Sequence, residues 1–326
     1  MKVTPANIRM WSRLGQRGAF FGAALPEIAK DKDNLKLMAA DIATLAGMTG
    51  FQKKFPEKFM NVGIAEQNMI GIAAGLAMSG YCVFTSTYAS FIAVRSLEHI
   101  RQHLSHLKLN IKVVGFAAGT IMAKSGISHW ATEDLAFMRA LPNIEVFSPA
   151  DALEAVKIAE YAASNDKPMY IRITGGTNCP IIYSDDYNFE AGKIFTLIEG
   201  EGVGIISTGS IISESLKAAK ILSEKNIPCA VYNMHTIKPI DKAGLKNIFD
   251  KHKFIVTVEE HNIIGGLGSA VAEYKSTLEN TPRQIFIGVP DTFAEAGSHN
   301  YVLSNLGLTA DKIAARIENE WSNSNA

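Results

Sequence analysis

Glu66 stands at the start of a segment that carries almost no charge. Residues 69–78 contain five alanines and glycines among methionine, isoleucine and leucine, so a helix here would be apolar on all sides and thin enough to pack closely against another helix. Burial of an ionised carboxylate is unfavourable without a partner. We therefore expect Glu66 to face a cation or to act as a neutral hydrogen-bond donor. The alternative is an ordinary first-turn acid that complements the helix dipole.

Three flat side chains and a histidine follow Glu66 along the chain. Phe84, Tyr88 and Phe91 could stack on a planar ligand, although core packing is the more common use of an isolated aromatic residue. His129 lies in a glycine-containing loop. Histidine can move a proton in either direction at neutral pH, because an unperturbed imidazole has a pKa of ~6.5. The alternative for His129 is a structural or solvated side chain.

Two arginines and one aspartate complete the set of chemically capable residues. Arg172 lies at the end of an expected strand, and its planar fork of donors suits a phosphate group, as does that of Arg17. A salt bridge is the alternative for both. Asp41 follows a short apolar strand, where a helix cap is the alternative.

Strand and helix patterns alternate along the chain, as in a parallel sheet covered by helices. Strands are expected over residues 35–40, 81–88, 111–116, 143–149 and 168–173, with helices over 13–29 and 90–104. The pattern is lost between 175 and 195, and a second series begins at 202–209, with further strands at 229–234 and 254–258. We predict an α/β protein of two three-layer domains, residues 1–180 and 196–326, joined by a linker at 181–195.

The composition excludes several classes of protein. Lysine plus arginine equal aspartate plus glutamate, 32 each, so no broad attraction to nucleic acid or to an anionic membrane is expected. The three cysteines are widely spaced and have no histidine or cysteine nearby, which argues against a zinc site or a disulfide framework. We expect neither a signal peptide nor a membrane-spanning segment, because residues 1–9 lack an apolar core and no apolar run is long enough to cross a bilayer. We expect a soluble cytoplasmic chain.

Five ordered motifs resemble parts of transketolases. The pyrimidine-binding domain of that family is resembled by VGIAEQN at 62–68, by STYASF at 86–91 leading to Arg95, and by SH at 128–129 followed by EDLAFMRALPN at 133–143. The transketolase C-terminal domain is resembled by MHTIKPID at 234–241 and EEHNIIGGLG at 259–268. The resemblance covers nearly the whole chain. The turn at 265–268 lacks the spacing of a phosphate-binding loop, and we interpret it as close helix–strand packing.

The resemblance implies a thiamine diphosphate cofactor and gives the candidate residues roles. Glu66 matches the glutamate that hydrogen-bonds ring nitrogen N1′ of the aminopyrimidine, and Asp41 matches an acid near the thiazolium. The family places its aromatic clamp at Phe84, Tyr88 and Phe91, of which Tyr88 is the strongest candidate and Phe91 the weakest.

The resemblance also implies how a sugar substrate would be bound. His129 matches the histidine that reaches the substrate. Arg172 matches the arginine that grips the substrate phosphate, and Arg17 is a looser second match. Ser125 replaces the acid that reads a sugar hydroxyl, and Leu45 stands near the place of a phosphate-contacting serine. These departures predict a donor or acceptor other than the usual pentose phosphates, or recognition of the sugar by other loops.

The Gly-Asp-Gly motif, which holds the diphosphate through magnesium in this family, is absent. The chain therefore resembles the C-terminal subunit of a split transketolase, inert alone, whose N-terminal partner supplies the diphosphate and Mg²⁺ site. Two-fold self-association would give a heterotetramer. Such an enzyme transfers a two-carbon ketol unit from a ketose or ketose phosphate to an aldose. Three alternatives stay open: a deoxyxylulose phosphate synthase, the beta subunit of a 2-oxoacid dehydrogenase, and a non-catalytic partner subunit.

Overall fold

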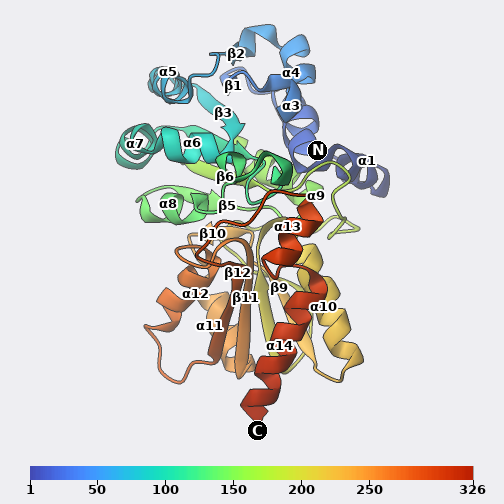
Figure 1. Ribbon diagram of the computed structural model, residues 1–326. Helices are drawn as coiled ribbons and strands as arrows, with labels where there is room; N and C mark the ends of the chain where they lie inside the picture. Colours follow the sequence, from blue (N-terminus) through green and yellow to red (C-terminus); the bar gives the residue numbers. More distant parts are fainter. Residues whose placement is uncertain (326) are drawn as a thin grey trace.

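The computed structural model describes residues 1–325, and its upper half in Figure 1 is built around a seven-stranded sheet. The strand order is β10-β5-β6-β4-β3-β1-β2, and every strand except β10 runs parallel to its neighbours. Such strands are covered on both faces and have nearly continuous apolar sequences. The strands from this half are β1 Leu35–Ala39, β2 Phe59–Asn61, β3 Cys82–Tyr88, β4 Ile111–Phe116, β5 Glu145–Phe147 and β6 Met169–Ile173.

Helices cover both faces of this first sheet. On one face lie α1, η1 and α9, which pack on each other, and on the other lie α5, α6 and α8. Thr4 caps α1 by accepting a hydrogen bond from the Asn7 backbone N–H, with Pro5 at the first helical position. The bounds are α1 Pro5–Arg17, η1 Gly18–Ala24, α2 Leu25–Ile28, α3 Ala43–Ala46, α4 Thr49–Lys54, η2 Pro56–Lys58, α5 Glu66–Met78, α6 Ala89–Arg95, α7 Leu97–Ile100, η3 Arg101–His106, η4 Ala123–Ser125, η5 Ile127–His129, α8 Asp134–Ala140 and α9 Ala152–Ser164.

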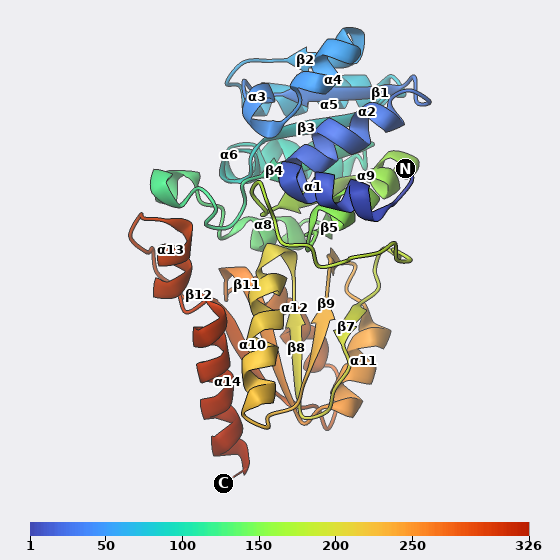
Figure 2. The same ribbon diagram turned by 90° about the vertical axis from the view of Figure 1, so that its right-hand side faces the viewer.

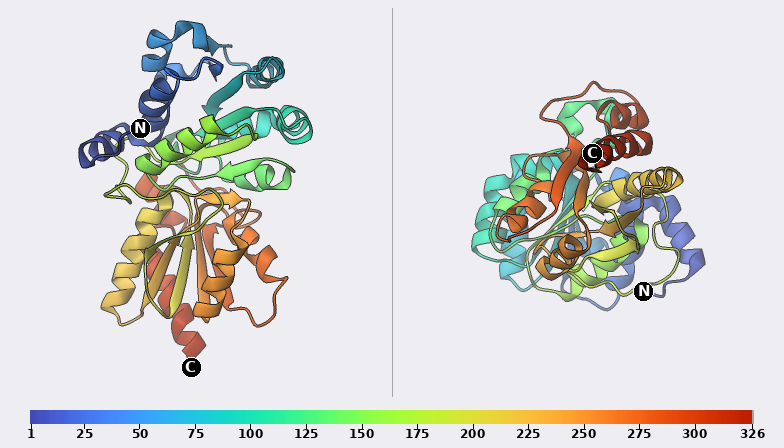
Figure 3. Two further views of the ribbon diagram at one scale, coloured as in Figure 1. Left: turned by 180° about the vertical axis from the view of Figure 1, so that it is seen from behind. Right: turned by 90° about the horizontal axis from the view of Figure 1, so that it is seen from below.

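The second sheet has five strands in the order β12-β11-β8-β9-β7, with β7 antiparallel to β9. Helices α10 and α14 pack side by side on one of its faces, as Figure 2 shows, and the chain ends far from the first sheet (Figures 1 and 3). The bounds are β7 Phe195–Ile198, β8 Val203–Ser207, η6 Gly209–Ile211, α10 Ile212–Glu224, β9 Cys229–Asn233, β10 Thr236–Lys238, α11 Lys242–Lys251, β11 Phe254–Asn262, α12 Leu267–Lys275, β12 Arg283–Val289, α13 His299–Asn305 and α14 Ala310–Asn325.

The two sheets are joined by more than the connecting segment. Strand β10 lies far along the sequence in the second half, yet it pairs antiparallel with β5 at the edge of the first sheet. The buried carboxylate of Glu260, in β11, accepts hydrogen bonds from the backbone N–H and the hydroxyl of Thr120, both at 2.7 Å. One hydrophobic cluster runs from α5 and α6 to β8, β9 and α12, so the two sheets share core residues.

The α/β class and the two sheets confirm the fold expected from the sequence. Each expected range contains or overlaps an observed strand, whereas β7, β10 and β12 were not expected. Asp151 caps α9 by accepting a hydrogen bond from the Glu154 backbone N–H. The helix expected from residue 13 begins instead at Pro5, and the helix expected over 90–104 is interrupted at Ser96. The domain boundaries at 180 and 196 remain a prediction, and β10 shows that the second segment also contributes to the first sheet.

The glycine turn before α12 is a close-packed junction. A Cβ atom at Gly266 would lie 2.0 Å from Glu259 Oε2, and one at Gly268 would lie 2.3 Å from the Phe286 ring. The Glu259 carboxylate accepts hydrogen bonds from the backbone N–H groups of Leu267 and Gly268, at 2.7 and 2.8 Å. A side chain from β11 therefore satisfies the helix N-terminus, which confirms helix–strand packing at this turn.

No helix within residues 1–325 is both long enough and apolar enough to cross a membrane.

Candidate functional site

Glu66 is the first residue of α5, and its side chain is buried, with 7% of its surface exposed. The N-cap residue of α5, Ala65, makes no side-chain hydrogen bond to the helix. Glu66 is the acidic residue of the first turn. The helix packs against β3 and α6 through Met69, Ile70 and Ala73. The expected burial of this carboxylate is confirmed, and its partner is a cation rather than a neutral group.

The cation is Arg95, the last residue of α6. Its Nη1 lies 3.0 Å from Glu66 Oε1, and its guanidinium carbon lies 4.0 Å from the centre of the Phe91 ring. Gln67, next to Glu66, donates a hydrogen bond from Nε2 to the Arg95 carbonyl oxygen at 2.9 Å. These contacts connect the first turn of α5 to the last turn of α6.

Tyr88, Phe91 and His129 form a cluster of three rings beside this ion pair. The His129 ring lies 5.3 Å from that of Tyr88 and 5.2 Å from that of Phe91, both edge to face, and the two aromatic rings are 5.4 Å apart. Nδ1 of His129 is 3.0 Å from the Ser128 hydroxyl, and Nε2 has no hydrogen-bond partner within residues 1–325. The structure thus brings together four residues predicted for the site: Glu66, Tyr88, Phe91 and His129.

Phe84 is not part of this cluster, which corrects its expected role in the clamp. It is completely buried in the core on the α1 and α9 face of the sheet, where its ring lies 6.1 Å from that of Phe20. Side chains alternate between the two faces along β3, so Phe84 points away from α5 while its neighbour Val83 packs on that side. Phe84 has no exposed ring face to offer a ligand.

Asp41 lies just after β1 and is exposed. Its φ of 56° places it in the left-handed region, which aspartate tolerates better than most residues. Its backbone N–H donates to Asn61 Oδ1 at 2.9 Å, and the same oxygen accepts from the Gly63 N–H at 3.1 Å. Asn61 therefore holds the loop that carries Asp41 next to the approach to Glu66.

Arg172 does not point into a substrate site, and its expected phosphate role is corrected. Its side chain is 1% exposed, and Nε lies 3.0 and 2.9 Å from the two carboxylate oxygens of Asp134. Nη2 donates to the carbonyl oxygens of Ala131 and Glu260, at 3.0 and 2.9 Å. Arg172 thus links β6 to α8 and to β11 of the second sheet.

Arg17, the looser of the two arginine matches, is the last residue of α1 and is half-buried. Burial raises the pKa of the Tyr88 hydroxyl, and the charge of Arg17 acts in the opposite direction. Partial burial likewise lowers the pKa of Arg17, and Tyr88 opposes that shift. Arg17 and the Tyr88 hydroxyl therefore influence each other electrostatically, and contact of Arg17 with a substrate anion stays a prediction.

Ser125 belongs to η4, in an exposed loop that leads through η5 to His129. The backbone N–H of Ser125 donates to the Met122 carbonyl, and the Ala123 carbonyl accepts from the Gly297 N–H of the second half. The loop that carries Ser125 and His129 is thus braced by the segment before α13.

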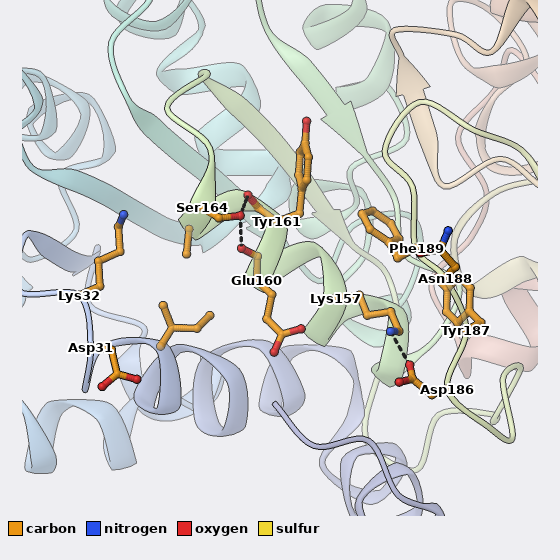
Figure 4. A pocket seen from close by; sticks show the side chains of 12 residues that line it. Asp31, Lys32, Lys157, Glu160, Tyr161, Ser164, Asp186, Tyr187, Asn188 and Phe189 are labelled. Carbon is orange, nitrogen blue, oxygen red and sulfur yellow. Dashed lines mark hydrogen bonds and ion pairs between the residues drawn. The ribbon is translucent and has the colours of Figure 1, made fainter.

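An open cavity of about 1020 Å³ lies between the end of α2, helix α9 and residues 186–189, away from the predicted site residues (Figure 4). Among the charged residues that line it, Lys157 contacts Asp186 at 2.5 Å, and Glu160 pairs with the N-terminal amine. Within residues 1–325, no group of three or more His, Cys, Asp or Glu side chains could hold a metal ion.

Two residues of the site, Arg95 and Asn61, were not predicted from the sequence. Arg95 only ends one of the family motifs, although its position four residues after Phe91 puts both side chains on one helix face, and a buried Glu66 requires a cation. Asn61 precedes the motif around Glu66, and nothing in its immediate sequence shows that its side chain reaches Asp41.

Comparison with known proteins identifies the two halves. The family model described as transketolase, pyrimidine binding domain, matches residues 17–177, and that of the transketolase C-terminal domain matches residues 192–313. A Methanocaldococcus jannaschii protein named as a transketolase C-terminal section is 40% identical over 302 residues, which cover 92% of this chain and 94% of that protein. A Phocaeicola vulgatus protein named as one subunit of an apulose-4-phosphate transketolase is 32% identical over 295 residues, covering 90% and 93%.

A solved structure described as a split gene transketolase, inactive beta4 tetramer, has a TM-score of 0.83 and 38% identity to this chain, covering 94% of this chain and 98% of that one. These matches extend over both sheets. The chain therefore belongs to the transketolase family, with the pyrimidine-binding and C-terminal domains of a C-terminal subunit.

Proposed function

We propose that this chain is the C-terminal subunit of a thiamine-diphosphate-dependent transketolase. The enzyme transfers a two-carbon ketol unit from a ketose or ketose phosphate to an aldose, and a separate N-terminal subunit supplies the diphosphate and Mg²⁺ site. The observation that carries the proposal is the grouping of the buried Glu66 carboxylate with the rings of Tyr88, Phe91 and His129, in a chain of this family.

The residues present fit the aminopyrimidine half of thiamine diphosphate. Glu66 offers a carboxylate in which Arg95 engages only Oε1, so Oε2 remains able to bond with N1′. Tyr88 and Phe91 offer flat apolar surface for a heteroaromatic ring. Asp41 lies on the neighbouring loop. When bound, thiamine diphosphate supplies the carbon nucleophile that carries the transferred unit.

In this proposal His129 moves a proton at the hydroxyl or carbonyl group of the sugar. Its Nδ1 contacts the Ser128 hydroxyl, which orients the ring, and its Nε2 is free within the described chain to address a ligand. An imidazole suits both directions of transfer because its ordinary pKa lies near neutrality.

We propose that Arg17 and Ser125 contact the sugar, and that its phosphate, where present, is not bound by Arg172. The support is the burial of Arg172 against Asp134 and the electrostatic influence of Arg17 on the Tyr88 hydroxyl. A relative at 32% identity is named for apulose 4-phosphate, a substrate outside the usual pentose phosphates. Residues 123–129 of this chain likewise differ from the usual transketolase motif. We therefore propose that its donor or acceptor is also other than the usual pentose phosphates.

The experiment combines this chain with the N-terminal subunit, thiamine diphosphate and Mg²⁺, and measures ketol transfer with a panel of ketose phosphates and aldoses. We expect activity in the mixture and none in either chain alone. Glu66→Gln should lower the rate roughly 10²–10⁴-fold, the usual range for a proton-transfer group, with an unchanged unfolding curve.

Pyruvate as donor tests the alternative reactions, because it is the substrate of decarboxylating thiamine enzymes and is not a ketose. Release of CO₂ from pyruvate at a rate above ketol transfer would replace the transketolase proposal by one of those alternatives. Activity that survives Glu66→Gln undiminished would remove Glu66 from the mechanism.

A further inference from the structure

The guanidinium of Arg95 lies between the buried carboxylate and the ring cluster. It bonds Glu66 Oε1 at 3.0 Å and covers one face of the Phe91 ring at 4.0 Å. Phe91 in turn contacts the rings of Tyr88 and His129. A single cation therefore contacts both the acid and the aromatic surface proposed for the aminopyrimidine.

The two partners of the ion pair differ in exposure. The Glu66 side chain is 7% exposed, whereas that of Arg95 is 49% exposed. The carboxylate is thus fixed in the protein and its cation approaches from the accessible side. Arg95 is held by the Phe91 ring and, through its backbone carbonyl, by Gln67 Nε2 at 2.9 Å. Its position at the end of α6 also favours a positive charge.

The bonding pattern leaves Glu66 able to serve two partners at once. Arg95 uses only Oε1, and within residues 1–325 Oε2 accepts no hydrogen bond. A cation that bonded both carboxylate oxygens of Glu66 would prevent the carboxylate from binding a ligand. The observed contact instead fixes the direction of the carboxylate while one oxygen stays available.

We propose that Arg95 is a positioning residue for Glu66, a role that rests on the proposed function. It aims Oε2 of Glu66 at the aminopyrimidine and keeps Phe91 in place for stacking. Arg95 contacts neither the reacting atoms nor the sugar in this role. It acts through Glu66 and Phe91.

The test uses the assembled two-subunit complex and two measurements: the affinity for thiamine diphosphate by titration calorimetry, and kcat with KM for the donor. Arg95→Ala should weaken thiamine diphosphate binding roughly 10- to 100-fold, the range for a lost charged hydrogen bond, and lower kcat with little change in donor KM. Because the Arg95 side chain is half exposed, millimolar guanidinium chloride should enter the space left by Arg95→Ala and restore cofactor affinity.

Coupling to Glu66 separates positioning from a general structural effect. In a Glu66→Ala background, Arg95→Ala should weaken cofactor affinity clearly less than it does in the wild type, because only its contact with Phe91 is then lost. Arg95→Lys should recover part of the affinity. The matched control is Arg101→Ala, since Arg101 is similarly exposed and pairs with Glu98 at 3.7 Å away from the ring cluster. It should bind thiamine diphosphate as the wild type does.

Wild-type or tighter affinity in Arg95→Ala, or losses that simply add in the double variant, would overturn the positioning role while leaving the proposed function intact. Failure of the wild-type complex to bind thiamine diphosphate would overturn both. Thermal unfolding of each variant confirms that the compared proteins are folded.

Discussion

At the scale of single residues, two arginines bind carboxylates in opposite settings. Arg172 and Asp134 are both 1% exposed and belong to the junction of the two sheets, whereas Arg95 is half exposed beside the candidate site. A buried ion pair is costly to break because the remaining charge has no water to solvate it. The first arginine therefore belongs to the core of the fold, and the second lies at the surface of the candidate site.

Arg172→Met should unfold at much lower denaturant concentration, with a loss of about 3–5 kcal/mol, because Asp134 is left buried without its cation. Adding Asp134→Asn should recover part of this stability. Lys246→Met is the control, since the exposed pair of Lys246 with Asp250 should contribute less than about 1 kcal/mol. If Arg172→Met kept its stability and raised the KM for a phosphorylated sugar, the phosphate role would return.

His235 should make the free energy of unfolding depend on pH. Burial lowers the pKa of His235 to about 4, and Asp241 opposes the shift. The unfolded chain takes up this proton near pH ~6.5 and the folded chain only near pH 4, so stability falls as the pH falls through this window. The full effect is roughly 3 kcal/mol at 1.36 kcal/mol per pKa unit.

The measurement is the difference between the wild type and His235→Asn, which retains a polar atom near Thr236 Oγ1. A difference is needed because burial raises the pKa of Asp151 to about 6 and of Glu259 to about 7, and both acids change stability with the opposite sign in this range. A difference that stays constant from pH 4 to 6.5 would contradict the prediction.

At the scale of elements, the glycine turn and α5 show glycine in two different roles. A Cβ atom at Gly268 would meet the Phe286 ring and Thr257, whereas one at Gly71 in α5 would meet nothing within 4 Å. Gly268 is needed for close packing, whereas the space beside Gly71 is empty and would accept a side chain.

Gly268→Ala should therefore destabilise the chain by about 1–3 kcal/mol, the cost of overpacking. Gly71→Ala is its control, and it should be neutral or stabilise by up to about 1 kcal/mol, because alanine favours a helix over glycine. Urea unfolding of the isolated chain measures the free energy of unfolding of both variants. Equal effects of the two substitutions would show that packing at the turn is not what selects Gly268.

The sequence predicted the central parallel strands because each is a compact apolar run, such as 111–116, which is β4. It did not predict β10, since Thr236–Lys238 is too short to carry a pattern and its pairing with β5 depends on tertiary contact. At the site, buried Glu66 was predictable from its apolar surroundings. The core position of Phe84 and the pairing of Arg172 with Asp134 were not, because both depend on which face or element lies opposite.

At the scale of the whole molecule, one side of α5 is left open. Gln67, Gly71, Gly75 and Met78 are exposed along it, although the helix carries no charge after Glu66. In the proposed two-subunit enzyme this face is where the partner or a second copy would pack.

Gly75→Leu should therefore leave the isolated chain at least as stable as the wild type, because a Cβ atom added there meets nothing within 4 Å, and should weaken assembly with the N-terminal subunit. Analytical ultracentrifugation of the mixed subunits measures the assembly. Lys220→Leu, on the exposed side of α10, is the control for added surface hydrophobicity. Unchanged assembly in Gly75→Leu would place the partner on another face.

The position of β10 limits where this chain could be divided into separate genes. A boundary within the connecting segment before β7 would put β10 on a different polypeptide from the sheet whose edge it completes, and would also separate Glu260 from Thr120 and Arg172 from the β11 carbonyl. Two such products would have to find each other before the first sheet was whole. Gene fission is therefore expected to keep the two α/β halves together as one inherited unit.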